Sequence, residues 1–238
     1  MKVNKTVVLL VVPPLRTQPL LPPIPVELDA AGNFAVLAGT TVENTGETAV
    51  YGGDVGTNHD NEIIGFPPGK VLPPNTTRVS DGATRQAHVD LTAAYKAAAN
   101  RPATHDLSGQ DLGGLTLLPG VYSFSKSATL DGTLTLNNQG DPDAKFIFQI
   151  GTTLTTSSGS AVITINGGPG PEAKSSVTWQ VGTSATLGAD STFEGNILAL
   201  NNITMEEASS IHDGSALSQH GKITLDTNKI TKGTGPTA

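Results

Sequence analysis

From Asn33 onward, short stretches of alternating apolar and polar residues recur between turns rich in Gly, Asn and Asp. Alternation with a period of two residues indicates strands that bury one face. When the chain is divided at its turns, the strands fall into three types in a fixed order, which indicates a repeat. The first type carries an apolar residue directly after a threonine. It covers residues 40–44, 127–131, 152–156, 184–188, 203–207 and 222–226.

The second and third strand types complete each repeat. The second type alternates and is polar outside, and it covers residues 48–53, 133–137, 161–166, 191–196 and 209–214. The third type is the most apolar on both faces, and it covers residues 34–39, 121–125, 146–150, 177–181, 197–201 and 216–220. Three strands in a repeat of roughly 20 residues predict a parallel β-solenoid with a triangular cross-section.

One segment with helical periodicity interrupts the strands. Apolar residues recur at helical spacing on one face of it, at Ala83, Ala87, Leu91, Ala94, Tyr95 and Ala98. Ser80 or Asp81 can cap its start and Pro102 stops it, so we expect a helix at about 81–100. Its apolar face needs a sheet that is also apolar outside, and the third side offers one. The fold class is therefore all-β with one long helix packed along one side of the solenoid.

The chain divides into three parts by composition. Residues 1–32 form a Pro-rich lead with a basic start and a short apolar run, Val7–Val12, which we interpret as a signal peptide or a disordered segment. Residues 33–230 form a single solenoid domain that includes the helix, and residues 231–238 form a flexible tail. We expect a secreted or extracellular protein without a membrane partner, because no later segment is apolar enough for an anchor.

Composition narrows the function. The formal net charge is -7 with only 14 Lys and Arg, and no basic stripe is visible, so we expect no nucleic-acid partner. The absence of cysteine excludes disulfides and thiol catalysis. Aromatic residues make up only 4% of the chain, which fits a core of stacked aliphatic layers rather than a conventional aromatic one.

The first side offers an unusual surface. We align its strands on apolar residues that we expect to point inward, namely Val42, Leu130, Leu154, Leu187, Met205 and Leu225. The residue before each is then Thr41, Thr129, Thr153, Thr186, Thr204 or Thr224. These threonines would stack as an outward column at the strand spacing of about 4.7–4.9 Å. The methyl and hydroxyl groups of stiff, β-branched side chains at a regular interval suit a regular lattice such as ice.

We therefore predict that this column, with Thr155 and Ser184 from the same strands, binds ice and the ordered water next to it. The methyl groups would order adjacent water, and the hydroxyls would hold that layer to the protein. Stacked threonines also stabilise a sheet by themselves, which leaves a carbohydrate-binding or adhesive surface solenoid as the alternative. Sugar binding usually uses aromatic platforms, and Trp179, the only tryptophan, falls on the third side, which disfavours that alternative.

We predict no enzyme activity, and no catalytic, cofactor or metal site. Parallel solenoids that cut polysaccharides place acidic pairs on one face. Here Asp54, Asp131, Asp190 and Asp226 scatter over different sides, and the histidines lack the spacing of metal ligands.

Long ordered stretches carry a family resemblance. They include "AVLAGTTVENTGETAVYGGDVG", "GFPPG", "VTWQVGTSATLGADSTFEGNILALNNITM" and "GSALSQHGKITLDTNKI", together with the stretch from "DLGGLTLLPGVYSFSKSATLDG" to "FIFQIGTTLTTSSGSAVITINGG". From about Phe34 to Ile230 the chain resembles the microbial β-solenoid ice-binding (antifreeze) protein family. The resemblance implies a discontinuous right-handed solenoid, a helix parallel to it, and a flat face that adsorbs to ice. We expect a monomer that inhibits ice growth and recrystallisation.

Departures from the family pattern temper this expectation. The step T-A/G-x-T/N is kept at 45–48 but lost at 189–192 and 207–210. We also expect four carboxylates to lie outward, one step along from the threonine column, at Glu43, Asp131, Glu206 and Asp226. A carboxylate holds its hydration shell strongly and disturbs ordered water. We therefore expect control of recrystallisation more than a large depression of the freezing point.

Overall fold

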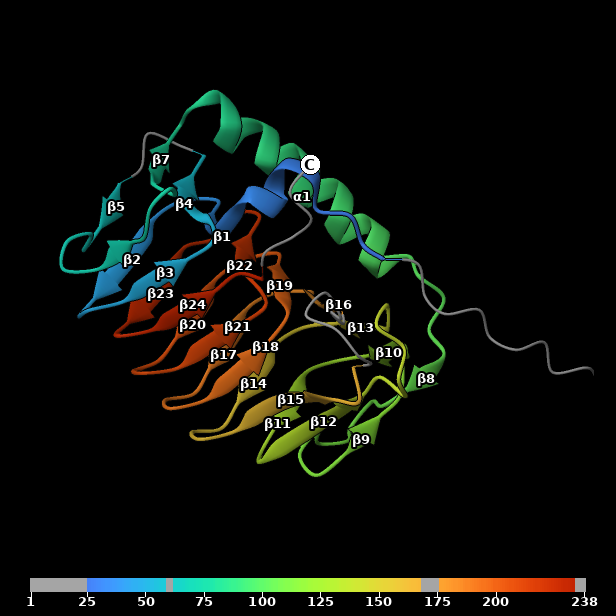
Figure 1. Cartoon of the computed structure of the whole chain (residues 1–238). Helices are drawn as coiled ribbons and strands as arrows, with labels where there is room; N and C mark the ends of the chain where they lie inside the picture. Colours follow the sequence, from blue (N-terminus) through green and yellow to red (C-terminus); the bar gives the residue numbers. More distant parts are fainter. Residues whose placement is uncertain (1–24, 59–61, 168–175, 234–238) are drawn as a thin grey trace, which may run out of the picture.

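The computed structural model describes residues 25–58, 62–167 and 176–233, and it confirms the predicted solenoid with a helix alongside (Figure 1). Within those ranges the strands form three sheets of nine, seven and eight strands, which we call sheets A, B and C. Neighbouring strands within each sheet pair in parallel, since successive coils of the solenoid run in the same direction. Sheet A is the predicted third side, sheet B the first and sheet C the second.

Sheet A lies beneath the helix. Its strands, in spatial order, are β7 (Thr77–Val79), β4 (Asp54–Thr57), β1 (Phe34–Ala38), β22 (Ala216–Ser218), β19 (Asn196–Ala199), β16 (Ser176–Val181), β13 (Lys145–Ile150), β10 (Gly120–Phe124) and β8 (His105–Asp106).

Sheets B and C form the other two sides. Sheet B contains β11 (Ala128–Leu130), β14 (Leu154–Thr156), β17 (Ala185–Leu187), β20 (Ile203–Met205), β23 (Ile223–Asp226), β2 (Val42–Thr45) and β5 (Ile63–Ile64). Sheet C contains β6 (Lys70–Val71), β3 (Ala49–Tyr51), β24 (Lys229–Thr231), β21 (Ser210–His212), β18 (Thr192–Glu194), β15 (Ala161–Ile165), β12 (Thr133–Asn137) and β9 (Thr116–Leu117).

The stacking order differs from the chain order at one seam. Strands β1, β2 and β3 of the first coil pair with β22, β23 and β24 of the last one. The strands built before the helix, β1 to β7, therefore continue the stack at the end that the chain reaches last (Figure 1). This arrangement is the discontinuity that the family resemblance implied.

Helix α1 (Gly82–Ala99) covers part of sheet A. Asp81 caps it by accepting a hydrogen bond from the Thr84 backbone N–H at 2.8 Å, which satisfies one of the free donors at a helix start. Its buried face carries Ala87, Leu91, Ala94 and Ala98 and packs on outward-facing apolar residues of sheet A such as Ile147, Leu198 and Leu217. The small alanines allow close approach to the sheet. Ala83, expected on this face, is exposed, and Thr84 is buried instead.

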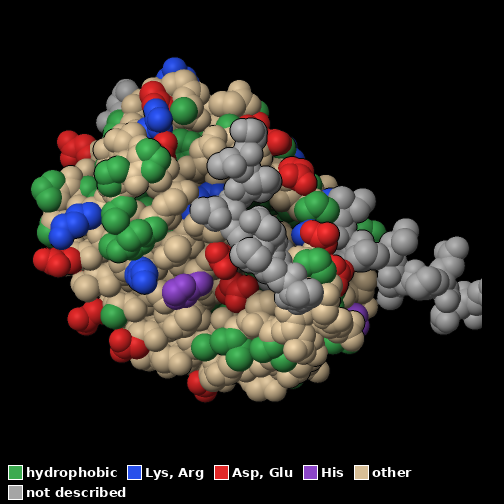
Figure 2. Space-filling view, viewed as in Figure 1, with side chains coloured by type: hydrophobic (Ala, Val, Ile, Leu, Met, Phe, Trp, Pro, Cys, Tyr) green, Lys and Arg blue, Asp and Glu red, His purple; other side chains and the backbone are tan. Residues whose placement is uncertain are grey.

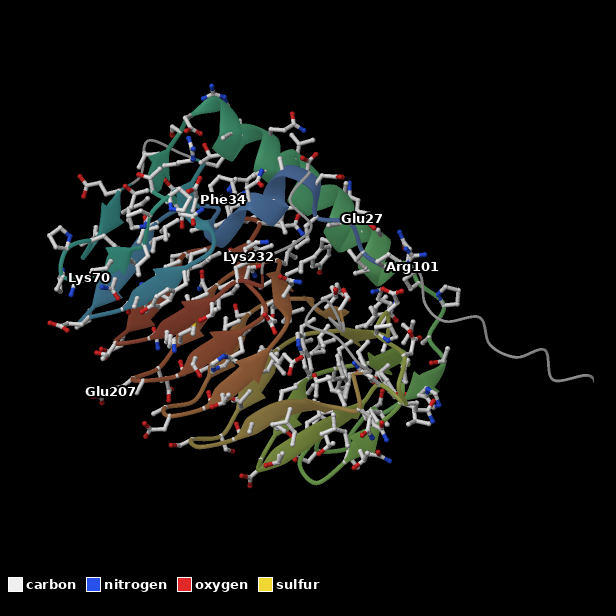
Figure 3. The ribbon with its side chains drawn as sticks, viewed as in Figure 1. Glu27, Phe34, Lys70, Arg101, Glu207 and Lys232 are labelled. Carbon is white, nitrogen blue, oxygen red and sulfur yellow. The ribbon has the colours of Figure 1, made fainter. Side chains whose placement is uncertain are left out.

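The last residues of the predicted lead also contact the helix. They form most of the short 3₁₀ helix η1 (Asp29–Asn33), and the Ala30 N–H donates to the Asp90 carboxylate at 3.1 Å, so the end of the predicted lead is ordered against α1. Phe34, at the start of β1, lies beneath α1 (Figure 3). Residues 1–24, which hold the predicted signal peptide, lie outside the described residues. The helices of the described part, α1 and η1, lack the length or the apolar character that crossing a bilayer requires.

The interior of the solenoid is mostly aliphatic, and part of its aromatic content forms a stack of rings. The rings of Tyr122 and Phe148 lie 5.4 Å apart, and those of Phe148 and Trp179 lie 3.8 Å apart. The stack runs along sheet A because these residues occupy the same register position in β10, β13 and β16. The stack therefore fills the interior beneath β10, β13 and β16 with aromatic rings.

Candidate functional site

Sheet B brings five threonines into one column. The parallel register places Thr129 beside Thr155, and Thr155 beside Thr186. It then places Thr186 beside Thr204, and Thr204 beside Thr224. Neighbouring strands of a sheet lie about 4.7–4.9 Å apart, so the column repeats its methyl and hydroxyl groups at that interval.

The column points outward because its neighbours in each strand point inward. In β17, Ala185 and Leu187 are buried in the core while Thr186 between them keeps contact with solvent. Thr129 and Thr155, at the β11 end of the column, are exposed. The column threonines of β17, β20 and β23 are half-buried. A β-branched side chain on a strand has few rotamers, so the column is a rigid surface.

A second outward row lies beside the column. The N–H groups of Leu154 and Ala185 donate to the carbonyl oxygens of Ser184 and Asn202, which continues the ladder by one residue. In the same way, the Ala128 N–H donates to the Thr153 carbonyl oxygen. The N–H groups of Ile203 and Ile223 donate to the carbonyl oxygens of Lys222 and Thr41. Of the predicted residues, Thr41, Thr153 and Ser184 therefore lie in this second row and not in the column.

The expected register is wrong for Thr153. Leu154 pairs with Ala128 and Ala185, whereas the sequence alignment had set it level with Leu130 and Leu187. Thr156 takes the inward place level with Leu130, where it is buried and its Oγ1 accepts a hydrogen bond from the Gly188 N–H at 2.9 Å. A threonine can be buried at low cost when its hydroxyl has such a partner.

The expected register is also wrong for Thr41. Val42 pairs with Ile223 instead of Leu225, so Glu43 occupies the position beside Thr224. Asn44 takes the inward place and stays hydrogen-bonded, because its Nδ2 donates to the carbonyl oxygens of Gly46 and Gly65. Glu43 was expected next to the column, and it lies within it.

Two further residues close the column at its ends. Ile64 of β5 lies beside Glu43 at one end and is 47% exposed. Asp111 lies beside Thr129 at the other end and accepts a hydrogen bond from the Thr129 hydroxyl. Sequence reasoning missed Asp111, although "DLGG" at 111–114 matches "TLDG" at 129–132 and could have indicated it.

Hydrogen bonds hold Asp111 in its ionised form. Burial raises the pKa of this carboxyl, but bonds from the Thr129 hydroxyl and from the Asp131 and Gly113 N–H groups outweigh burial. Its pKa therefore lies below the ordinary value of 3.8. The column thus ends in a fixed negative charge.

The other carboxylates lie along one margin of the column. Asp131, Glu206 and Asp226 each follow a column threonine by two residues, so they point outward next to it. The Glu206 Oε2 accepts a hydrogen bond from the Ala189 N–H at 3.2 Å, which orients this side chain along the turn.

Sheet C carries a less regular surface. Its outward row contains Thr133, Ala161, Thr192 and Ser210, and then Lys229. Lys, acidic and His side chains interrupt the face seen in Figure 2. Sheet A is partly covered by α1. Among the described residues, sheet B is therefore the side with the longest threonine column.

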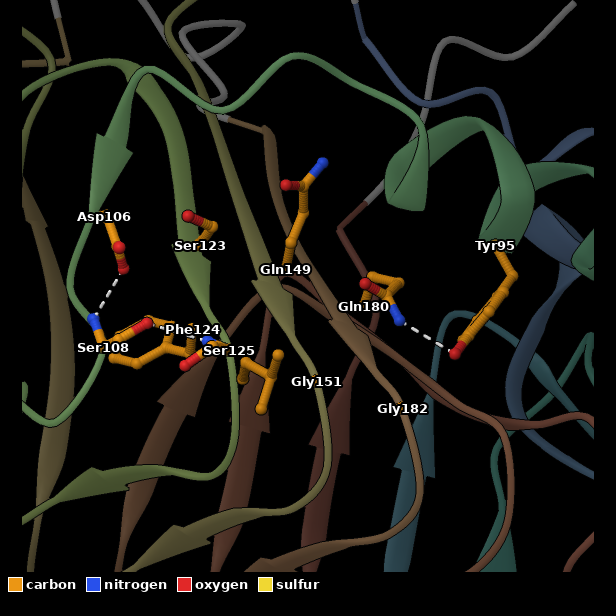
Figure 4. Close-up of a pocket in the computed structure, with 11 residues that line it drawn as sticks. Tyr95, Asp106, Ser108, Ser123, Phe124, Ser125, Gln149, Gly151, Gln180 and Gly182 are labelled. Carbon is orange, nitrogen blue, oxygen red and sulfur yellow. Dashed lines mark hydrogen bonds between the residues drawn. The ribbon is translucent and has the colours of Figure 1, made fainter.

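A polar groove lies on sheet A beside the end of α1. It measures about 460 Å³ and is drawn in Figure 4. Its polar groups bond largely to one another: Gln180 Nε2 donates to the Tyr95 hydroxyl at 2.8 Å, and the Ser108 N–H donates to Asp106 at 2.9 Å. Gln149 Nε2 donates to the carbonyl oxygens of Ala98 and Arg101 and so closes the end of the helix.

Trp179 offers no exposed ring to a sugar. It lies in β16 of sheet A, but its side chain points into the core, is 0% exposed, and donates its indole N–H to the Glu194 carbonyl oxygen.

Comparison with known proteins points in one direction. The model of a family described as Ice-binding-like matches residues 36–231. An ice-binding protein of Nostoc sp. (strain HG1) is 49% identical over 203 residues, which cover 85% of this chain and 72% of that protein. The solved structure of an ice-binding protein from the Antarctic ascomycete Antarctomyces psychrotrophicus has a TM-score of 0.80 and 37% identity, and the match covers 88% of this chain and 98% of that one. An ice-binding protein from an Antarctic biological consortium has a TM-score of 0.80 and 38% identity, with 92% and 96% covered.

Proposed function

Because the chain belongs to the Ice-binding-like family, we propose that it binds ice and that sheet B is the surface that does so. The observation that carries the assignment to sheet B is the column of five threonines in consecutive coils. Thr153, Ser184 and Thr41 in the neighbouring row widen this surface. The proposed partner is the ice lattice with its layer of ordered water.

The proposed mechanism follows from the chemistry of threonine. Water next to a methyl group keeps its hydrogen bonds to other water and becomes orientationally restricted. Hydroxyls at a fixed spacing can hydrogen-bond that layer and hold it to the protein. The side chains lose little rotamer freedom on binding because the sheet has already fixed them, which favours binding to a rigid lattice.

Adsorption of this kind opposes crystal growth. Ice must then advance between bound molecules as curved fronts, and a curved front melts at a lower temperature than a flat one. We propose that the protein inhibits both growth and recrystallisation and produces thermal hysteresis, the gap between the melting and freezing temperatures of a seeded crystal. The carboxylates along the margin keep their own hydration shells and limit the size of that gap.

We further propose that the protein works outside the cell as a monomer and performs no catalysis. The basic start and apolar run within residues 1–32 support export, since they match the order of regions in a signal peptide. A single copy offers the whole threonine column, so ice binding on sheet B requires no second copy.

The experiment is ice-affinity partition with paired variants. The wild-type protein should be enriched in a slowly grown ice hemisphere. Thr186→Tyr should lose this enrichment and recrystallisation inhibition, because a ring in the centre of the column lifts the flat surface off the lattice. Thr192→Tyr is the matched control, since Thr192 is an exposed threonine in the same coil but on sheet C. Full activity of Thr186→Tyr with a native circular dichroism spectrum would show that sheet B is not the ice-binding surface.

A further inference from the structure

Residues 25–33, which we call the N-terminal strap, pack along α1 before the chain enters β1 (Figure 1). Within the strap, Val26 is 8% exposed and Ala31 is 0% exposed. Both belong to the apolar cluster that α1 forms with the outer face of sheet A, together with residues such as Leu91 and Leu198. The strap therefore completes the burial of the apolar face of the helix.

Hydrogen bonds attach the strap to the helix at two points. The Arg101 Nη2, just beyond the end of α1, donates to the Pro25 carbonyl oxygen at 3.2 Å. The Ala30 N–H donates to the Asp90 Oδ2 at 3.1 Å, and the Asp90 Oδ1 accepts a hydrogen bond from the Gln86 Nε2 at 2.9 Å. The Asp90 carboxylate is thus held by one donor from its own helix and one from the strap.

The strap contains the first small residues of the chain at which an export protease could cut. Signal peptidases cut after small residues in a pattern like A-x-A. Residues 1–24 contain no Ala, Gly or Ser, and the first such residues are Ala30 and Ala31. A cut between or directly after them would leave a chain that begins inside the strap.

A chain cut at Ala30–Ala31 would fold without most of the strap. It would lose the buried side chain of Val26, and the apolar surface that this side chain covers would face water, which costs free energy in proportion to its area. Asp90 and Arg101 would each lose the hydrogen bond that the strap provides. The helix would then be held on sheet A by fewer contacts.

We propose that the N-terminal strap is part of the working protein and holds α1 on sheet A. The chain is then not processed at Ala30–Ala31, and any removal of the lead takes place before Pro25. The part of this inference that concerns processing rests on the proposed export. The part that concerns the helix is independent of export and of ice binding.

The first experiment identifies the N-terminus of the protein made from the full chain. The chain is produced in a bacterium, and mass spectrometry reads the first residue of the folded protein in the periplasm and in the cytoplasm. We expect that residue at or before Pro25 in both fractions. A folded protein of full stability that begins at Ala31 or Gly32 would overturn the proposal. A chain found only in the cytoplasm would contradict the proposed export, and the second experiment would still test the strap.

The second experiment loosens the strap within the full chain. Val26→Asp places a charge in the apolar cluster, so the strap should leave the helix. The melting temperature should fall by about 5 °C or more, and the amides of α1 should exchange their hydrogens faster. Glu27→Gln is the matched control, because Glu27 is the exposed neighbour in the same strap, and it should change neither quantity.

Equal melting temperatures and equal exchange in α1 for these two variants would overturn the role of the strap. Should Val26→Asp fail to fold, Val26→Ala provides the same comparison with a smaller effect, because it removes apolar surface without adding a charge. Ice-affinity partition of the wild-type protein is measured in parallel. Its failure, with the expected results for the strap, would contradict the proposed function alone.

Discussion

Glu43 lies directly beside Thr224 in the parallel register of β2 and β23. A carboxylate thus occupies the position that threonines hold in the coils from β11 to β23. It forms an ion pair with the Lys222 Nζ at 2.9 Å, and both side chains are well exposed, so the pair contributes about 0–1 kcal/mol to stability. The proposed ice-binding column therefore stops at the seam because Glu43 replaces a threonine there. Substituting Glu43 should change the stability of the protein little.

Replacing Glu43 with threonine should lengthen the active surface. The variant Glu43→Thr removes a strongly hydrated group and adds a sixth β-branched side chain to the column, so thermal hysteresis should increase. The measurement is hysteresis at matched concentration, after melting temperatures have been found to agree. The control is Glu47→Thr, an exposed acidic residue in the turn that follows β2. An equal increase in both variants would trace the effect to net charge.

Carboxylates at the margin of the column offer a second test of the mechanism. Glu206→Thr and Asp131→Thr should each raise hysteresis, because each replaces a hydrated charge beside a column threonine. Asp141→Thr, in an exposed turn away from sheet B, should leave hysteresis unchanged. Unchanged or lower hysteresis in both margin variants would mean that these carboxylates lie outside the contact area or help to bind ice.

Removal of the hydroxyl should lower the stability of the protein much more at Thr156 than at its neighbour Thr155 in β14. Thr156→Val leaves the buried Gly188 N–H without its acceptor and should cost about 1–3 kcal/mol of stability. Thr155→Val changes an exposed side chain and should alter stability by no more than about 0.5 kcal/mol. Denaturant unfolding of the two variants checks this. Equal stabilities would contradict the inward position of Thr156.

Asp111 should make the stability of the protein depend on pH in the acidic range. Its pKa is lowered in the folded state, so its ionised form contributes stability above the ordinary value of 3.8 that is lost as the pH falls through the folded pKa. Asp111→Asn should therefore lower the melting temperature at pH 6 and narrow its difference from wild type toward pH 2. A difference that stays constant over this range would mean that the charge of Asp111 is not what holds Thr129 and the adjacent turn.

The repeat pattern was sufficient to predict the three sides and the position of the helix. In most coils the second inward position of the first-side strand is a large apolar residue, such as Leu130, Leu187 or Leu225, and this position aligns the strands. The Ala-rich face of α1 likewise had only one apolar surface on which to dock. These features follow from burial, which leaves a strong periodic signal in the sequence.

The predicted strand register was wrong where a polar residue occupies an inward position. In β14 the prediction placed Leu154 level with Leu130 because it is the aliphatic residue of the strand. Nothing in "TTLTT" distinguishes the buried Thr156 from its exposed neighbour. In β2, Asn44 is buried because of bonds to Gly46 and to Gly65, and Gly65 lies far along the chain. Hydrogen-bond partners that come from other coils set these positions, and a pattern of hydrophobicity does not record them.

The seam between β2 and β23 has a consequence for how the protein is made. The first coil emerges early in synthesis, but its partner strands β22, β23 and β24 are among the last to appear. Until then β1, β2 and β3 have unpaired backbone groups along one edge, and closing this contact brings together residues that are nearly the whole chain apart. Such long-range pairing is slow, and an open strand edge invites association with other chains. A ribosome that stalled before β22 would release a chain whose first coil is paired on one edge with β4, β5 and β6 but lacks the strands that cover its other edge.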